Sequence, residues 1–129
     1  MSPKFCTINT FFEMIKENFI RLFENSIKEN WDVPAFTDYI EEQTLTYAEV
    51  GTEVAKLHLL FDTIGIEKGT KISLIGKNGT NWCVTYIAVV TYGAVIVPIL
   101  QDFNPNDVHH IVNHSDSTLL FISDSIWET

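Results

Sequence analysis

Hydrophobic residues in the first quarter of the chain recur at helical spacing. Apolar side chains recur every three or four residues up to about Asn30. Asn9 or Thr10 can cap the helix that this spacing indicates. The residues of this stripe are Phe12, Ile15, Phe19, Leu22, Phe23 and Ile27. Charged residues fall on the other face of this helix: Lys16, Glu17, Arg21, Glu24 and Lys28. The pattern predicts one amphipathic helix that packs its apolar stripe on a domain.

The pattern then changes to short β-prone runs. Residues 34–39 and 43–46 are typical of two strands, and residues 40–42 would form the turn between them. Thr46 and Glu49 then match a capping box, in which the hydroxyl and the carboxylate satisfy reciprocal backbone donors at a helix start. This second helix is predicted to end at Gly65 as a left-handed cap. Its apolar face comprises Tyr47, Val50, Val54, Leu57, Phe61 and Ile64.

From Lys71 onward, strand and helix patterns alternate. Strands are predicted near residues 71–76, 94–98 and 118–122, with helices near 80–92 and 104–114. Gly93 ends the first of these helices, and Asn104 with Pro105 begins the second. Short connections between alternating elements favour parallel strands with right-handed crossovers. The predicted fold class is α/β: a partial doubly wound parallel sheet with a βαβαβ core, preceded by an N-terminal helix and a short β-hairpin.

The stretch from Asn78 to Gln101 lacks charged residues and is therefore compared with a membrane span. It contains Asn, Thr, Gly and Pro residues, and it becomes β-branched after Gly93. A buried helix followed by a buried strand explains this better than a transmembrane segment. We therefore expect no transmembrane segment here.

Composition and charge limit the possible partners. A chain of 129 residues is one domain or part of one, and 46% hydrophobic residues suffice for a core. The 17 acidic against 8 basic residues give a net charge of −9, which disfavours nucleic acid and anionic membranes. Cys6 and Cys83 make no disulfide framework, and the N-terminus lacks a secretory pattern. The expected compartment is the cytoplasm, with Cys83 as a small buried hydrophobe.

Four histidines are candidate ligands. His110 and His114 are four residues apart on one predicted helix, so both could reach one metal ion. His109 points to another face, and no third ligand has a fitting local spacing. An exposed or interfacial histidine pair is therefore the favoured interpretation. His58, alone on its helix, is interpreted as structural.

Residues 75–80 superficially resemble a phosphate-binding loop after a strand. A Walker loop needs Gly, four residues, Gly-Lys and then Ser or Thr, so that several amides converge on phosphate. Here Gly76-Lys77 follows the strand directly, without a glycine-rich turn before it. The favoured interpretation is a strand-to-helix turn capped by Asn78 or Thr80.

No other group of residues assembles a reactive centre. Asp38, Glu41 and Glu42 are interpreted as a solvated turn. Neither cysteine has a histidine or a cationic residue nearby in sequence to activate it. We therefore predict no catalytic, cofactor-binding or metal-binding residue in residues 1–129.

Several segments together resemble the adenylate-forming (AMP-binding) enzymes, the superfamily of acyl-CoA ligases and adenylation domains. Leu45–Val50 is similar to the family's Leu-Thr-Tyr-x-Glu-Leu segment, and residues 65–72 resemble its Gly-Val-x-x-Gly-Asp-x-Val turn and strand. Gly93–Pro98 matches the Gly-Ala-x-x-x-Pro strand. The resemblance covers roughly residues 10–127.

Two of these features look most like long-chain fatty acid–CoA ligases. They are the Asn-x-x-x-Trp spacing of Asn78 and Trp82, and the Val-Pro-Ile ending of residues 97–99. Three positions depart from the pattern. Thr70 stands in place of the usual Asp, and Asn81 stands in place of the acidic residue that usually precedes the Trp. Leu100 stands where those ligases often carry an aromatic residue.

The resemblance implies a full enzyme that activates a fatty acid with Mg-ATP through an acyl-adenylate and transfers it to coenzyme A. The family's phosphate loop, adenine-binding segment and catalytic lysine match no position here. Residues 1–129 are therefore expected to be an incomplete N-terminal subdomain, inactive alone and binding no cofactor itself. Expected partners are the remainder of its own polypeptide and a second copy, forming a homodimer through uncovered apolar surface.

Two alternatives stay open. The first is part of an amino-acid or aryl-acid adenylating enzyme, because the acyl pocket of the family lies in later segments. The second is a free-standing, non-enzymatic α/β interaction module that keeps only the scaffold. Coding sequence continuing past Thr129 into a Gly-rich Ser/Thr/Lys loop would discriminate between an enzyme and such a module.

Overall fold

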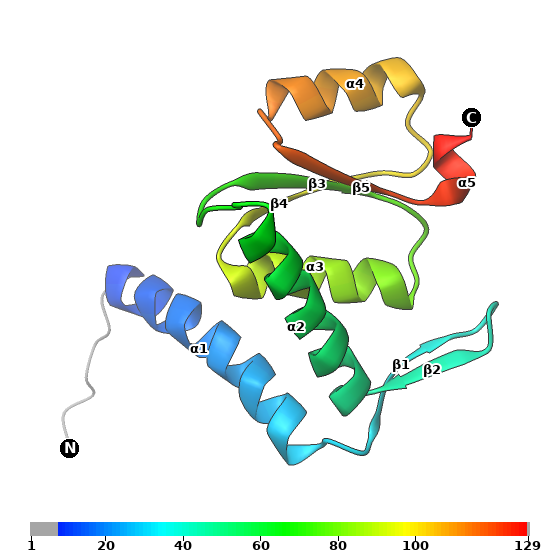
Figure 1. Ribbon diagram of the computed structural model, residues 1–129. Coiled ribbons are helices and arrows are strands. Elements are labelled where there is room, and N and C mark those ends of the chain that lie inside the picture. The colour runs from blue at the N-terminus through cyan, green and yellow to red at the C-terminus, as the bar shows by residue number, and fades with distance from the viewer. Residues whose placement is uncertain (1–7, 129) are drawn as a thin grey trace.

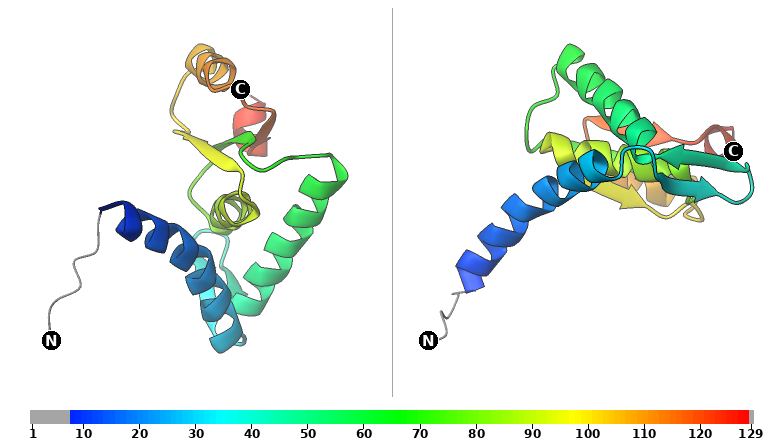
Figure 2. Two further views of the ribbon diagram at one scale, coloured as in Figure 1. Left: turned by 90° about the vertical axis from the view of Figure 1, so that its left-hand side faces the viewer. Right: turned by 90° about the horizontal axis from the view of Figure 1, so that it is seen from below.

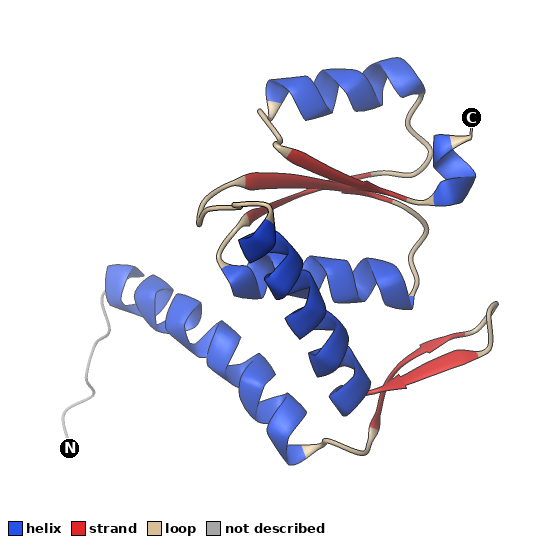
Figure 3. Ribbon diagram, in the orientation of Figure 1, coloured by secondary structure: helices blue, strands red, loops and turns tan. Residues whose placement is uncertain are grey.

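The computed structural model describes the backbone of residues 8–128 and the side chains of residues 19–128. Five helices and five strands follow one another along this part of the chain (Figures 1 and 3). Their bounds, in chain order, are α1 Ile8–Glu29, β1 Pro34–Asp38, β2 Gln43–Thr46, α2 Tyr47–Thr63, β3 Lys71–Ile75, α3 Thr80–Tyr92, β4 Val95–Ile99, α4 Pro105–His114, β5 Leu119–Ile122 and α5 Asp124–Trp127.

The central layer is a parallel sheet with strand order β4-β3-β5. Ile72 in β3 aligns with Ile96 on one side and Leu119 on the other. Helices α2 and α3 lie against one face of the sheet, and α4 lies against the other (Figures 1 and 2). The antiparallel hairpin of β1 and β2 stands apart from this sheet. The predicted βαβαβ core and its preceding hairpin are therefore confirmed.

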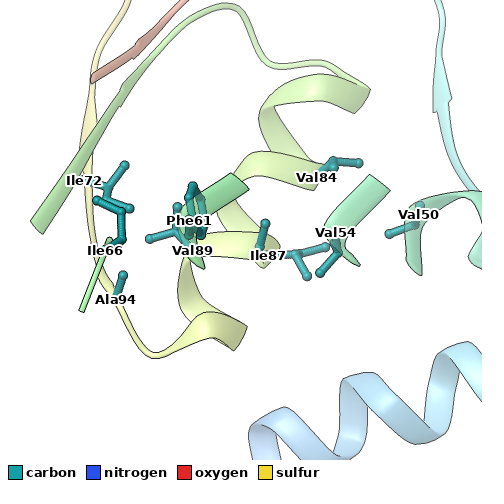
Figure 4. Packing of buried hydrophobic residues seen from close by; sticks show 10 residues of the cluster. Val50, Val54, Phe61, Ile66, Ile72, Val84, Ile87, Val89 and Ala94 are labelled. Atoms are coloured by element: carbon teal, nitrogen blue, oxygen red, sulfur yellow. The ribbon is translucent and has the colours of Figure 1, made fainter. Parts of the chain in front are cut away.

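Strand β3 is buried on both faces, so alternate residues enter two different cores. Ile72 and Leu74 point toward α3, and Ser73 and Ile75 point the other way. The larger core contains buried residues from α2, α3 and β3, with Phe61 completely buried among them (Figure 4). The smaller core joins Ile75 to buried residues of β4 and α4.

Both ends of α2 match the sequence-based expectation. The Thr46 hydroxyl accepts from the Glu49 amide at 3.2 Å, and the Glu49 carboxylate accepts from the Thr46 amide at 2.8 Å. At the other end Gly65 has φ of +76°. Its amide donates to Asp62, while the Ile66 amide donates to Phe61. This pair of bonds is a Schellman motif, which satisfies carbonyls that the helix leaves free.

Gly93 ends α3 in the same way. Its φ is +92°, and the amides of Gly93 and Ala94 donate to Val90 and Val89. Its carbonyl then accepts from the Gly69 amide at 2.8 Å, which fastens the start of β4 to the loop before β3. Within the described residues no helix is both long and apolar enough to cross a bilayer.

Two expectations about α1 need correction. Helix α1 begins at Ile8, so Asn9 and Thr10 lie inside it rather than at its cap. Phe19 and Leu22 are 40% and 62% exposed, because the described side chains of α1 pack on the body through Phe23 and Ile27, nearer its C-terminal end. The side chains of Phe12 and Ile15 lie outside the described ones.

Two smaller differences concern burial and the C-terminal end. Cys83 is only half-buried rather than buried, and that burial raises the pKa of its thiol. Helix α5 was not predicted from the sequence, because a four-residue helix offers too few positions for a periodic pattern.

Replacing Gly93 with Val should destabilise the fold by about 1–3 kcal/mol, because a β-branched residue resists a positive φ. Chemical denaturation measures this free energy of unfolding. Gly93→Asn is the matched control, since Asn tolerates the left-handed region, and it should cost less. Equal stability of wild type and Gly93→Val would show that this conformation imposes no constraint.

Candidate functional site

The carboxyl ends of β3 and β5 open into a crevice of about 590 Å³. The loop after β3 leads to α3 on one face of the sheet, whereas α5 follows β5 and packs Ile126 into the core on the opposite face. Open α/β sheets bind ligands where neighbouring strands send their connections to opposite faces. The crevice lies at such a point, and its volume is in the range of small-molecule sites.

The β3–α3 loop forms the first wall of the crevice. Gly79 is the N-cap of α3 and makes no side-chain cap, so the predicted cap by Asn78 or Thr80 is wrong. The Thr80 hydroxyl is buried and instead donates to Gln43 Oε1 of β2, at 3.4 Å. This contact between residues far apart in sequence explains why a local capping rule fails here.

The hairpin forms the second wall through Asp38. Its Oδ1 accepts from the amides of Ile40 and Glu41, at 3.0 and 3.1 Å, in an Asx turn. Its Oδ2 lies only 2.8 Å from where a Cβ on Gly79 would stand. Glu41 and Glu42 are exposed, as the predicted solvated turn requires, but Asp38 is half-buried. Its carboxylate lies beside the amino end of α3, where the helix dipole favours negative charge.

The charges around the crevice are mostly negative. Asp38, Glu41 and Asp124 line it, against Lys77 as the single basic lining residue. Trp82 adds an aromatic wall and stacks on Tyr86 with ring centres 5.3 Å apart. Three carboxylates near one ammonium oppose the binding of a phosphate group. Residues 75–80 thus form a strand, turn and helix start without the electrostatics of a phosphate site.

His58 has the structural role expected from the sequence. It lies between α2 and α3, and its Nε2 donates to the Ala88 carbonyl at 2.9 Å. The Thr91 hydroxyl is 3.1 Å from the same nitrogen. Both partners belong to α3, so the imidazole ties the two helices together.

The imidazole rings of His110 and His114 lie side by side on α4. Their centres are 5.6 Å apart and their planes differ by 10°. Both side chains are exposed, as is His109. Within residues 8–128 no group of three or more His, Cys, Asp or Glu is placed to hold a metal ion.

Two polar clusters escaped the sequence analysis. The Ser73 hydroxyl, completely buried in β3, lies 2.6 Å from Ser117, which is 2.7 Å from Ser115. The Tyr92 hydroxyl donates to Asp62 or to the Ile66 carbonyl, and the bond to Asp62 raises the pKa of the tyrosine. The first cluster could have been suspected from the sequence, because Ser73 is a polar residue within an otherwise apolar strand. Both clusters brace elements of the fold and neither lines the crevice.

Comparison with known proteins assigns the family. The family described as AMP-binding enzyme matches residues 23–129, and the chain belongs to it. Long chain acyl-CoA synthetase 3 of Arabidopsis thaliana is 30% identical over 80 residues, which are 62% of this chain and 12% of that protein. The chain thus spans about an eighth of the length of this relative.

Solved structures show the same fold. The N-terminal domain of FACL13 from Mycobacterium tuberculosis superposes with a TM-score of 0.76 at 20% identity, over 84% of this chain and 28% of that one. The anthranilate CoA ligase AuaEII, in complex with anthranoyl-AMP, gives a TM-score of 0.77 at 17% identity, over 84% and 21% of the two chains. The resemblance to adenylate-forming enzymes and the α/β fold class are confirmed.

Replacing Gly79 with Ala should test the closed contact at the crevice rim. The new methyl group would displace the Asp38 carboxylate and strain its bonds to the amides of Ile40 and Glu41, so we expect a loss of about 1 kcal/mol in the free energy of unfolding. Gly76→Ala is the matched control, because its Cβ would lie 3.5 Å from Ser123, an ordinary contact. The loss should shrink in an Asp38→Ala background. An unchanged loss in that background would exclude Asp38 as its cause.

Proposed function

We propose that this chain is the N-terminal scaffold of an ATP-dependent ligase that activates a long-chain fatty acid and transfers it to coenzyme A. The observation that carries the proposal is the family match over residues 23–129. The 30% identity to a plant long-chain acyl-CoA synthetase supports the choice of a fatty acid. The Asn78 and Trp82 spacing supports the same choice. The cytoplasmic location expected from the sequence stays a prediction.

The described residues do not fit Mg-ATP. The crevice carries three carboxylates and one lysine, and no glycine-rich phosphate loop occurs in the sequence. ATP, Mg²⁺ and coenzyme A would therefore be held by other segments of the enzyme in this proposal. The contribution of residues 1–129 is a rigid sheet on which those segments assemble.

An aryl-acid ligase is the second candidate function. It is prompted by the likeness of fold to the anthranilate CoA ligase AuaEII. Departures at Thr70, Asn81 and Leu100 from the long-chain ligase pattern weaken the choice of a fatty acid but favour no particular alternative. In this proposal the acyl pocket lies in later segments of the enzyme, so those segments would make the choice between the two substrates.

The decisive experiment reads the coding sequence beyond Thr129 and expresses the whole protein that it encodes. The expressed protein should release pyrophosphate when given Mg-ATP, coenzyme A and palmitate, and much less when given anthranilate or amino acids. A preference for anthranilate would show that the substrate is an aryl acid and not a fatty acid. A reading frame that stops at Thr129 would favour the free-standing module.

The 129-residue chain alone should bind Mg-ATP weakly or not at all. The physical reason is repulsion between the phosphates and the acidic crevice, with no loop of converging amides to offset it. Isothermal titration calorimetry measures this directly. Micromolar affinity for Mg-ATP would overturn the scaffold role.

We also propose that the chain self-associates as a two-fold dimer. An apolar groove of about 320 Å³ lies between α1, β1 and α2, and the exposed Phe19 and Leu22 line it. Exposed apolar surface of this kind favours a partner. Sedimentation at micromolar concentration in moderate salt should show a dimer that Leu22→Glu disrupts. Leu59→Glu, on the outer side of α2, is the control, and a monomeric wild type would refute the dimer.

A further inference from the structure

Helix α4 carries a pair of imidazoles that the proposed function leaves without a role. His110 and His114 are one turn apart, both are exposed, and each contacts the other's ring. Among the described residues, no hydrogen bond or ion pair engages either ring. We propose that His110 and His114 form a two-imidazole site for one divalent transition-metal ion, of the class of Ni²⁺, Cu²⁺ and Zn²⁺.

The geometry of the pair suits a shared ion. Residues four apart on a helix project from the same face, one above the other. A metal about 2.0–2.1 Å from one nitrogen of each ring would place the ring centres about 5 Å apart at a tetrahedral angle. The observed separation of 5.6 Å is close to this value, but the ring planes differ by only 10°. To bind one ion, each ring must therefore turn about its Cβ–Cγ bond until its plane contains the metal.

The surrounding charge also favours a cation. No Lys or Arg occurs from Asn78 to the end of the sequence, whereas Asp102, Asp107, Asp116, Asp124 and Glu128 are acidic. His114 lies in the last turn of α4, where the helix dipole attracts positive charge. Helix α4 itself therefore carries no Lys or Arg that would repel a divalent ion.

The donor set selects the class of metal. Imidazole suits Ni²⁺, Cu²⁺ and Zn²⁺, whereas Mg²⁺ and Ca²⁺ prefer oxygen ligands. Because no third His, Cys, Asp or Glu joins the pair in residues 8–128, water completes the coordination sphere. The affinity should follow the order Cu²⁺, Ni²⁺, Zn²⁺ expected for nitrogen ligands.

Calorimetric titration of Ni²⁺ into the untagged 129-residue chain tests the site. We expect saturable binding of one Ni²⁺ per chain. His110→Ala and His114→Ala should each weaken it by at least about tenfold, because one imidazole alone loses the chelate advantage. His109→Ala is the matched control on the same exposed helix and should keep the wild-type affinity.

A second measurement distinguishes metal binding at His110 and His114 from metal binding at other side chains of the chain. Added Zn²⁺ should shift the imidazole NMR signals of His110 and His114 and leave those of His58 unchanged. Circular dichroism checks that each variant keeps its helices. No binding of Ni²⁺ up to millimolar concentration, unchanged affinity in the His110→Ala and His114→Ala double variant, or an equal loss in His109→Ala would each overturn the proposal.

Discussion

The burial of β3 between two apolar layers is the constraint on which the rest of the structure depends. A strand that is covered on both faces needs a helix on each side, and the right-handed crossovers after β3 and β4 place α3 and α4 there. Phe61 of α2 reaches the same core and makes edge contacts with Tyr92 and Phe121. Helix α2 is therefore held by the sheet and α3 together. The crevice lies where β3 ends at Ile75, and the helices packed on the sheet hold its walls in place.

The elements that could be predicted from the sequence are those specified by neighbouring residues. The capping box at Thr46, the positive φ of Gly65 and Gly93, and the alternation of buried strands and helices all depend on residues close together in the chain. Each was predicted and each is confirmed. Local rules also placed β4 and α4 to within about one residue, which is the usual uncertainty of helix and strand ends.

The features that could not be predicted depend on contacts between distant segments. Asp38 meets Gly79 only because the hairpin lies over the start of α3, and Thr80 donates to Gln43 for the same reason. Ser73 is tolerated in a buried strand because Ser117, forty-four positions later, supplies a hydroxyl partner. A buried hydroxyl without such a partner would cost about 1–3 kcal/mol. The acidic character of the crevice likewise arises from two distant segments, the β1–β2 hairpin with Asp38 and Glu41 and the start of α5 with Asp124.

The two edges of the sheet differ in a way that bears on the proposed scaffold role. Strand β4 carries Pro98, which has no amide to donate to a further strand. Strand β5 offers Leu119–Ile122, an uncharged run whose side chains are only half-buried on both faces. An edge of that kind invites another strand, whereas a proline discourages one. If the chain is the N-terminal part of a ligase, further strands would therefore add beside β5. The crevice between β3 and β5 would then lie inside the enlarged sheet, where additional segments could change the balance of charge that now opposes phosphate.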